Sequence, residues 1–208
     1  MIMGDEYLAG LTYPTLYASV LDKLESKNPA AVQQVRAGLQ SADAQNPGFL
    51  LQLTKTLLTK SELTQVNLQE AFLRLQAQAP NDDLEIPDRP EPPYQELSQR
   101  AIKLRKILAR IPDEMADRRT FLETIKEIAN SIKKLLDATN SMYNFVPLTA
   151  QGSVERRKKE FVHYSKKFSN TLKEYFKGEN ANQVFVSANQ LIYQTSLIIR
   201  TVREKTRD

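Results

Sequence analysis

The chain contains one histidine, and that histidine belongs to its one recognisable half of a metal-binding motif. Glu160 and His163 form a Glu-x-x-His pair, with which some four-helix bundles hold two metal ions. Such a centre needs a second pair and two further glutamates, so we interpret His163 as a solvated side chain beside the core residue Phe161. Glu123 and Glu127 lie four residues apart and fit a helix surface better than a catalytic pair.

Other catalytic and cofactor-binding patterns are also missing from the sequence. With no cysteine, the chain has no disulfide framework, thiolate zinc site or cysteine nucleophile, and this fits a reducing interior. It has no glycine-rich phosphate loop and no HExxH motif. We therefore predict a protein without enzymatic activity, metal or cofactor. We also expect neither a signal peptide nor a membrane span, because no long apolar stretch is present.

Lysines at regular spacing are more informative. Lys126 and Lys133 are seven residues apart, as are Lys166 and Lys173, so each pair occupies one face of a helix. Small and apolar residues lie beside both pairs. If the two helices are neighbours, the lysines border a groove suited to an acidic amphipathic helix. The alternative is two solvated lysine faces, which are common on protein surfaces.

Four consecutive cations, Arg156, Arg157, Lys158 and Lys159, form a basic run. We expect this run in the first turns of a helix, where the helix dipole disfavours positive charge. An anionic partner such as phosphate head groups would explain it. A solvated helix start is the alternative, because each exposed charge there costs little.

These residues must be positioned by helices, because glycine is scarce and alternating β-branched patterns are hard to find. Apolar spacing, proline positions and capping signals predict four short helices between residues 14 and 79. The first is expected to begin at Pro14, and the last at Asn67, with Glu70 completing a capping box. The segment 49–58 has apolar residues on more than one face. Val35, Leu57 and Leu58 are thus candidates for a second interface by which the domain dimerises, unless they are buried inside a compact unit.

Residues 80–93 separate two regions of different charge. This stretch holds five prolines and five acids, and we predict a semi-rigid extended linker. Residues 1–79 carry a net charge of −1, the linker −4 and residues 94–208 +9. The C-terminal region therefore favours anionic partners.

Residues 94–208 show four longer amphipathic patterns. We predict helices over about 95–110, 113–140, 153–176 and 184–202, with Ser153 as the N-cap of the third. Short connections make them an antiparallel bundle. The predicted fold is all-α, with a helical dimerisation domain (1–79), an acidic proline-rich linker (80–93) and a four-helix bundle (94–208).

Several long segments of the sequence resemble the programmed cell death protein 10 family, also called the cerebral cavernous malformation 3 protein family. The resemblance covers nearly the whole chain, from about Pro14 to Val202. The segments that carry it are RPEPPYQEL (89–97), IPDEMADRRTFLETIKEIANSIKKLLD (111–137), KKEFVHYSKKFSNTLKEYF (158–176) and VFVSANQLIYQT (184–195).

The resemblance implies a bundle similar to the focal adhesion targeting domain and an N-terminal domain that pairs with Ste20-like kinases of the germinal centre kinase III group, or with itself when no kinase is present. It also implies that the bundle binds leucine- and aspartate-rich helices of the paxillin type, a similar helix in a cavernous malformation partner protein, and striatin-type scaffolds. Phosphoinositide binding and a cytoplasmic location with Golgi or plasma-membrane association are further expectations.

Matching the family's motifs to this chain assigns residues to two sites. The pairing face comprises Val35, Gly38, Leu57 and Leu58. The partner-helix groove comprises Lys126, Ala129, Ile132, Lys133, Leu136, Lys166, Ser169, Leu172 and Lys173, and it coincides with the groove expected from lysine spacing. Gly38 is a departure from the family pattern, because it removes a side chain from the pairing face.

Two other classes of function stay open on the sequence alone. A basic helical bundle can bind nucleic acid or phosphoinositides, but nucleic-acid binders interleave aromatic with basic residues, whereas these phenylalanines sit at core spacing. We therefore expect no nucleic-acid partner. A bundle enzyme with two metal ions is the other class, and metal analysis of the purified protein would test it.

Overall fold

A computed structural model describes residues 6–178 and 180–206, and every regular element in these ranges is helical. This confirms the predicted all-α class. The elements in chain order are α1 (Glu6–Thr12), the π-helix η1 (Tyr13–Tyr17), α2 (Ala18–Glu25), α3 (Pro29–Gln45), α4 (Phe49–Lys60), α5 (Leu68–Gln76), the 3-10 turn η2 (Asp82–Leu84), α6 (Pro92–Leu108), α7 (Ile111–Glu114), α8 (Arg118–Ser141), the 3-10 turn η3 (Met142–Asn144), α9 (Leu148–Tyr175) and α10 (Ala181–Lys205).

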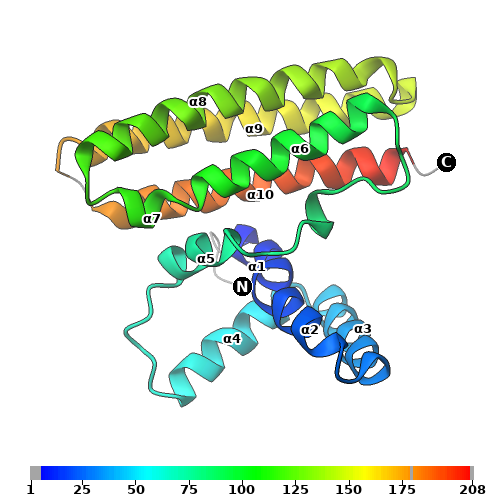
Figure 1. The fold of residues 1–208 in the computed structure, drawn as a ribbon, viewed down its shortest axis with the longest axis vertical. Coiled ribbons are helices and arrows are strands. Elements are labelled where there is room, and N and C mark those ends of the chain that lie inside the picture. Colours follow the sequence, from blue (N-terminus) through cyan, green and yellow to red (C-terminus); the bar gives the residue numbers. More distant parts are fainter. Residues whose placement is uncertain (1–5, 179, 207–208) are drawn as a thin grey trace.

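The four longest C-terminal helices lie side by side as an elongated bundle, and α2, α3 and α4 project away from it (Figure 1). Helices α1 and α5 lie between the arm and the bundle and pack against α10. Within the bundle, α9 packs mainly against α10, and α8 packs mainly against α6. The bundle therefore consists of two closely packed helix pairs, with α8 and α9 as neighbours across the seam between them.

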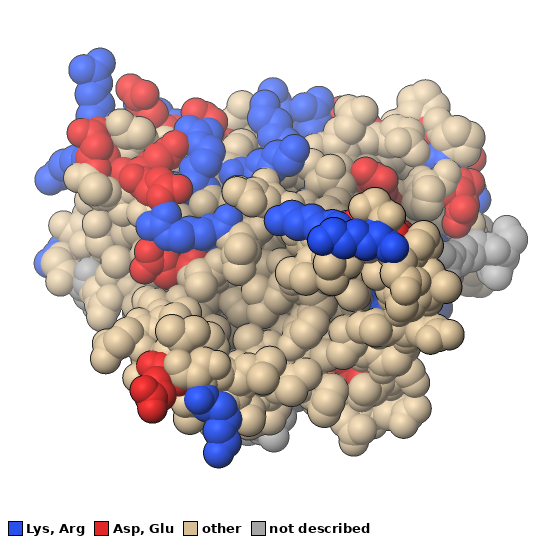
Figure 2. Space-filling model, turned by 60° about the horizontal axis from the view of Figure 1, so that its bottom comes forward, with Lys and Arg blue, Asp and Glu red and all other residues tan. Residues whose placement is uncertain are grey.

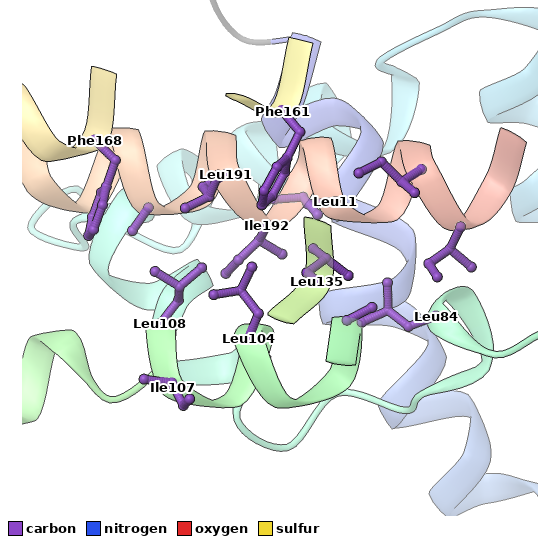
Figure 3. Packing of buried hydrophobic residues seen from close by; sticks show 14 of the residues in the cluster. Leu11, Leu84, Leu104, Ile107, Leu108, Leu135, Phe161, Phe168, Leu191 and Ile192 are labelled. Carbon is purple, nitrogen blue, oxygen red and sulfur yellow. The ribbon is translucent and has the colours of Figure 1, made fainter. Parts of the chain in front are cut away.

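The bundle core includes residues from outside the four bundle helices. Leu104 of α6, Leu135 of α8 and Phe161 of α9 point toward one another (Figure 3), and all three are completely buried. Leu11 of α1 and Leu84 of η2 lie in the same cluster. Each fully buried large apolar side chain contributes about 1.5–3 kcal/mol, so Leu11 and Leu84 hold α1 and the linker on the bundle.

The first helix begins at Glu6 and not at Pro14, which corrects the sequence-based prediction. Proline has no N–H to donate, and the chain continues through it as a short π-helix in which the Ala18 N–H bonds the Tyr13 carbonyl. Gly10 explains why α1 can lie so close to α10. A Cβ atom at Gly10 would stand 2.3 Å from the Tyr193 ring, so only glycine fits without displacing that ring.

The linker packs against the bundle and is not the semi-rigid extended spacer that the sequence predicts, which is a second correction. Leu84 and Ile86 are buried in the core, and Asp82–Leu84 form a 3-10 turn. Arg105 of α6 is only 1% exposed. It donates hydrogen bonds to Asp83 at 3.0 Å, to the Asn81 side chain at 2.5 Å and to the Ala79 carbonyl at 3.2 Å. The division into domains at residues 79 and 94 remains a prediction.

Arg105→Ala is expected to destabilise the protein by about 3 kcal/mol or more, because it leaves the partly buried Asp83 carboxylate without its partner. Burial already raises the pKa of Asp83 despite the nearby guanidinium, so the unpaired anion would be poorly tolerated. Arg100→Ala is the control, because Arg100 forms only an exposed pair with Glu96, worth less than about 1 kcal/mol. Denaturant unfolding measures both variants, and equal losses would contradict the role given to Arg105.

Two bundle helices begin elsewhere than the sequence predicts. The predicted helix from Asp113 is split into α7 and α8, since Asp117 caps α8 by accepting the Thr120 N–H. Helix α9 begins at Leu148, directly after Pro147, so Ser153 is not its N-cap. Gly152 lies inside this helix, where glycine costs about 1 kcal/mol relative to alanine.

Candidate functional site

The residues predicted for the pairing face lie on the projecting arm, which is formed by α2, α3 and α4 and the loop after α4. Val35 on α3 is 50% exposed and Leu57 on α4 is 54% exposed, while Leu58 is half-buried and Gly38 is exposed. The arm also exposes other large apolar side chains, namely Val20, Leu24, Phe49, Leu63 and Val66. Isolated exposed leucines are ordinary, but this many apolar side chains on one small arm indicate a surface that a partner covers.

The arm cannot cover this surface itself, because its core is small. Helix α3 buries one apolar residue, Val32, and α4 buries Leu50 and Leu51 near its start. Few charges replace the missing cover, since α3 carries Arg36 and Asp43 and α4 carries two lysines. In Figure 2, charged side chains gather in the upper part of the face shown and are sparse in the lower part.

The α8 side of the partner-helix groove presents the predicted residues on one helix flank. Ile132 and Leu136 are half-buried, and Ala129 between them is exposed. The opposite flank of α8 lies toward α6 and the turn that follows it, since α8 packs mainly against α6 and Glu127 pairs with Arg110 in that turn. The predicted groove residues therefore lie on the side of α8 away from α6.

The α9 side of the groove faces α8. Lys158 of α9 donates a hydrogen bond to Asn140 of α8 at 3.1 Å, which places this flank of α9 against α8. Leu172, close to the same flank, is buried, and Ser169 is exposed with its hydroxyl bonded to the Ser165 carbonyl. The residues predicted for the floor of the groove are thus small or apolar on both helices.

The four groove lysines are free to meet a partner. Lys126, Lys133, Lys166 and Lys173 are all exposed, and none forms an ion pair within the part of the chain that the structure describes. Two lie on each helix, seven residues apart. Unpaired cations beside a partly apolar surface favour an anionic, partly apolar partner.

The basic run lies elsewhere on its helix than the sequence predicts. Because α9 begins at Leu148, the run starts more than two turns inside the helix, and the unfavourable dipole argument does not apply. Arg157 pairs with Glu160 at 2.7 Å, and Lys158 pairs with Glu155 at 2.7 Å. A hydrogen bond from Lys158 is the main cause that lowers the pKa of Glu155, and a hydrogen bond from Tyr143 adds to it. Arg156 and Lys159 stay exposed.

His163 is exposed, next to the buried Phe161, and its ring contacts the edge of Tyr164. Among residues 6–178 and 180–206, no three metal-ligating side chains come together. No helix within those same ranges is long and apolar enough to cross a bilayer.

A cleft between the arm and the bundle has no counterpart in the sequence patterns. This cleft has a volume of about 940 Å³ and lies between α1, η1, α3 and the C-terminal part of α10. Arginines and acids both line it, including Arg36, Arg200, Asp43 and Asp82. No periodic pattern links these residues, since they come from α3, η2 and α10, which only the tertiary fold brings together.

Comparison with known proteins identifies the family of the chain. A family model described as programmed cell death protein 10, dimerisation domain, matches residues 5–64, the range that contains the four residues predicted for pairing. A second, described as programmed cell death protein 10, C-terminal, matches residues 66–158. The programmed cell death protein 10 homolog of Caenorhabditis elegans is 51% identical over 208 residues, which is 97% of this chain and 96% of that protein. A dimerisation domain supports an adaptor role. The chain therefore belongs to the programmed cell death protein 10 family.

Proposed function

We propose that the protein is a non-enzymatic adaptor, which pairs through its arm and captures acidic helices on its bundle. The observation that carries this proposal is the exposed apolar pairing face within the matched dimerisation domain. Because Val35 and Leu57 are half exposed, burying them against an apolar partner would be favourable. The bundle contributes a second surface of different character, which is basic and narrow.

The partner of the arm is a second copy of the chain or a kinase of the germinal centre kinase III group. Both occupants require an apolar helical surface, and both would cover the same residues. They therefore compete, and a kinase would replace self-pairing. This view rests on the family resemblance for the kinase and on the dimerisation domain for self-pairing.

The partner of the groove is an acidic, leucine-rich helix, as found in paxillin-type proteins and in the cavernous malformation partner protein. Its leucines would lie on Ala129, Ile132, Leu136 and Leu172, and its aspartates would face the four groove lysines. Apolar burial would supply most of the affinity, since exposed ion pairs contribute only about 0.2–1 kcal/mol each. We expect micromolar affinity, about −8 kcal/mol. Striatin-type scaffolds are further candidates for the bundle.

An adaptor must hold both partners at once, and this tests the proposal. Sedimentation of the protein with a labelled acidic helix and the pairing segment of such a kinase should give one species that contains all three. Separate complexes that exclude each other would contradict the adaptor role.

A second candidate function is contact with phosphoinositide membranes, at the Golgi or plasma membrane. Leu148 is 85% exposed and lies about three helical turns from the exposed Lys159, so both occupy one face of α9. An apolar tip followed by cations suits the surface of an anionic bilayer.

Arg156→Glu with Lys159→Glu is expected to weaken binding to phosphoinositide-containing vesicles at least tenfold, because each basic residue near an anionic surface contributes about 1 kcal/mol. Binding of the acidic helix should be unchanged, since neither residue is part of the groove. Vesicle co-sedimentation and peptide titration on the same double variant measure the two effects. Unchanged vesicle binding would exclude this contact, and lost peptide binding would mean that the groove is misplaced.

A further inference from the structure

Gly38 lies in the middle of α3, and no contact or backbone conformation within the described part of the chain requires glycine at this position. The helix runs from Pro29 to Gln45, and glycine inside a helix is less favourable than alanine. A Cβ atom at Gly38 would meet nothing within 4 Å. The backbone there is helical, so a left-handed conformation does not demand glycine either.

Three of the other described glycines are required by a close contact or by their backbone conformation. Gly10 has the Tyr193 ring against its backbone, as described above. Gly48 and Gly178 adopt φ angles of 87° and 108°, which disfavour every residue with a side chain. Gly152 resembles Gly38, since it is helical, exposed and has open space around it, but it lies on the bundle.

The residues around Gly38 indicate that contact with a partner explains the glycine. Val35 and Ala42 lie about one turn before and one turn after it on the same face of α3, and Val35 is half exposed. A helix packing on this face meets an indentation at Gly38, flanked by apolar side chains. The distance between two packed helices depends on the size of the side chains at their closest point, and glycine makes this distance smallest.

The charge of this face favours a second copy of the chain as the occupant. In a two-fold dimer the same patch faces itself, so an unpaired charge would meet its own like charge. The two charged residues of α3, Arg36 and Asp43, lie away from this face of the helix, and Arg36 is already paired with Asp22 at 2.9 Å. The face is therefore compatible with a copy of itself.

We propose that Gly38 is the point of closest approach between the two copies of the chain in the dimer, and that its missing side chain sets their separation. This inference rests on the proposed pairing through the arm and adds to it the position that determines how tightly the subunits fit. A single methyl group at this position would keep the subunits apart and reduce the contact of Val35 and Leu57 with the partner.

Gly38→Ala tests the inference because its effects on folding and on pairing have opposite signs. In a chain made monomeric by Leu57→Asp, alanine should raise the melting temperature through its higher helix propensity. In the otherwise unchanged chain, it should raise the dissociation constant of the dimer at least tenfold. Gly38→Leu should raise it at least a hundredfold. Sedimentation equilibrium measures the dissociation constants.

Gly152→Ala is the matched control, since it also fills an exposed helical glycine, but on α9. It should raise the melting temperature in the same way and leave the dissociation constant unchanged. If Gly38→Ala pairs as tightly as the unchanged chain, or more tightly, the close approach at Gly38 is wrong even though the pairing face stands. If Leu57→Asp fails to separate the subunits, the proposed pairing face itself is wrong.

Discussion

Leu57→Asp is expected to convert the dimer into a monomer, with a dissociation constant at least a thousandfold higher. Both subunits would bring an aspartate into an apolar contact, and burying an unpaired charge costs several kcal/mol. A factor of a thousand corresponds to about 4 kcal/mol. The monomer should stay folded, since Leu57 is half exposed in the single chain. Light scattering measures the mass and circular dichroism the fold.

Thr59→Asp is the control for Leu57→Asp. Thr59 is also exposed on α4, but it lies on the opposite side of the helix two residues on. It introduces the same charge near the same place, so a dimer should persist. The monomeric Leu57→Asp variant should also lose the kinase while it still binds the acidic helix. A Leu57→Asp chain that dimerises like the unchanged protein would exclude α4 from the pairing face.

Reversal of the four groove lysines to glutamate is expected to weaken acidic-helix binding about a thousandfold. Each reversal replaces an attraction by a repulsion, worth roughly 1 kcal/mol at an exposed site. Four reversals together remove about 4 kcal/mol, which leaves a micromolar complex at millimolar affinity. The bundle should stay folded, because Lys126, Lys133, Lys166 and Lys173 are exposed and have no ion-pair partners to lose within the described residues.

A second set of four lysines provides a control with the same change in net charge. Lys103, Lys106, Lys134 and Lys167 are exposed on the bundle and lie outside the groove. Their reversal should lower the association rate modestly through the overall field and leave the affinity within about tenfold. Titration of a fluorescent acidic helix measures both variants at one salt concentration. Equal losses would mean that net charge, and not the groove, attracts the helix.

The sequence predicts the helices well where the apolar spacing is regular. Helix α8 repeats Phe121, Ile128 and Leu135 at intervals of seven, and all three are buried in the bundle as expected. The N-cap at Asn67 also forms, because its side chain accepts the N–H groups of Gln69 and Glu70. Local signals of this kind depend only on neighbouring residues.

Other features depend on tertiary contacts and cannot be read from local patterns. Proline and acid content predicts a semi-rigid extended linker, but Leu84 and Ile86 are buried in the bundle core. Arg105 looks like one more basic residue on α6, although the linker encloses it. Gly152 resembles a loop residue and favours a later start for α9, but the helix begins at Leu148 and contains this glycine.

The candidate sites divide in the same way. Seven-residue spacing is sufficient to place Lys126 with Lys133 on one face, but only the fold shows that α8 and α9 are neighbours. The sequence leaves open whether Val35 and Leu57 are buried or form a pairing face. The structure shows that both are exposed, because the core of the arm is small. The cleft between α3 and α10 needs the complete fold, because its residues are distant in the chain.

The composition of the complex with a labelled acidic helix tests the central claim most directly. Sedimentation velocity on the unchanged protein, with absorbance of the label and of the protein followed separately, gives the number of each component. Two independent surfaces predict a complex of two chains and two helices, formed with micromolar affinity. A single chain with one helix would contradict pairing through the arm, and a dimer that leaves the helix free would contradict the groove.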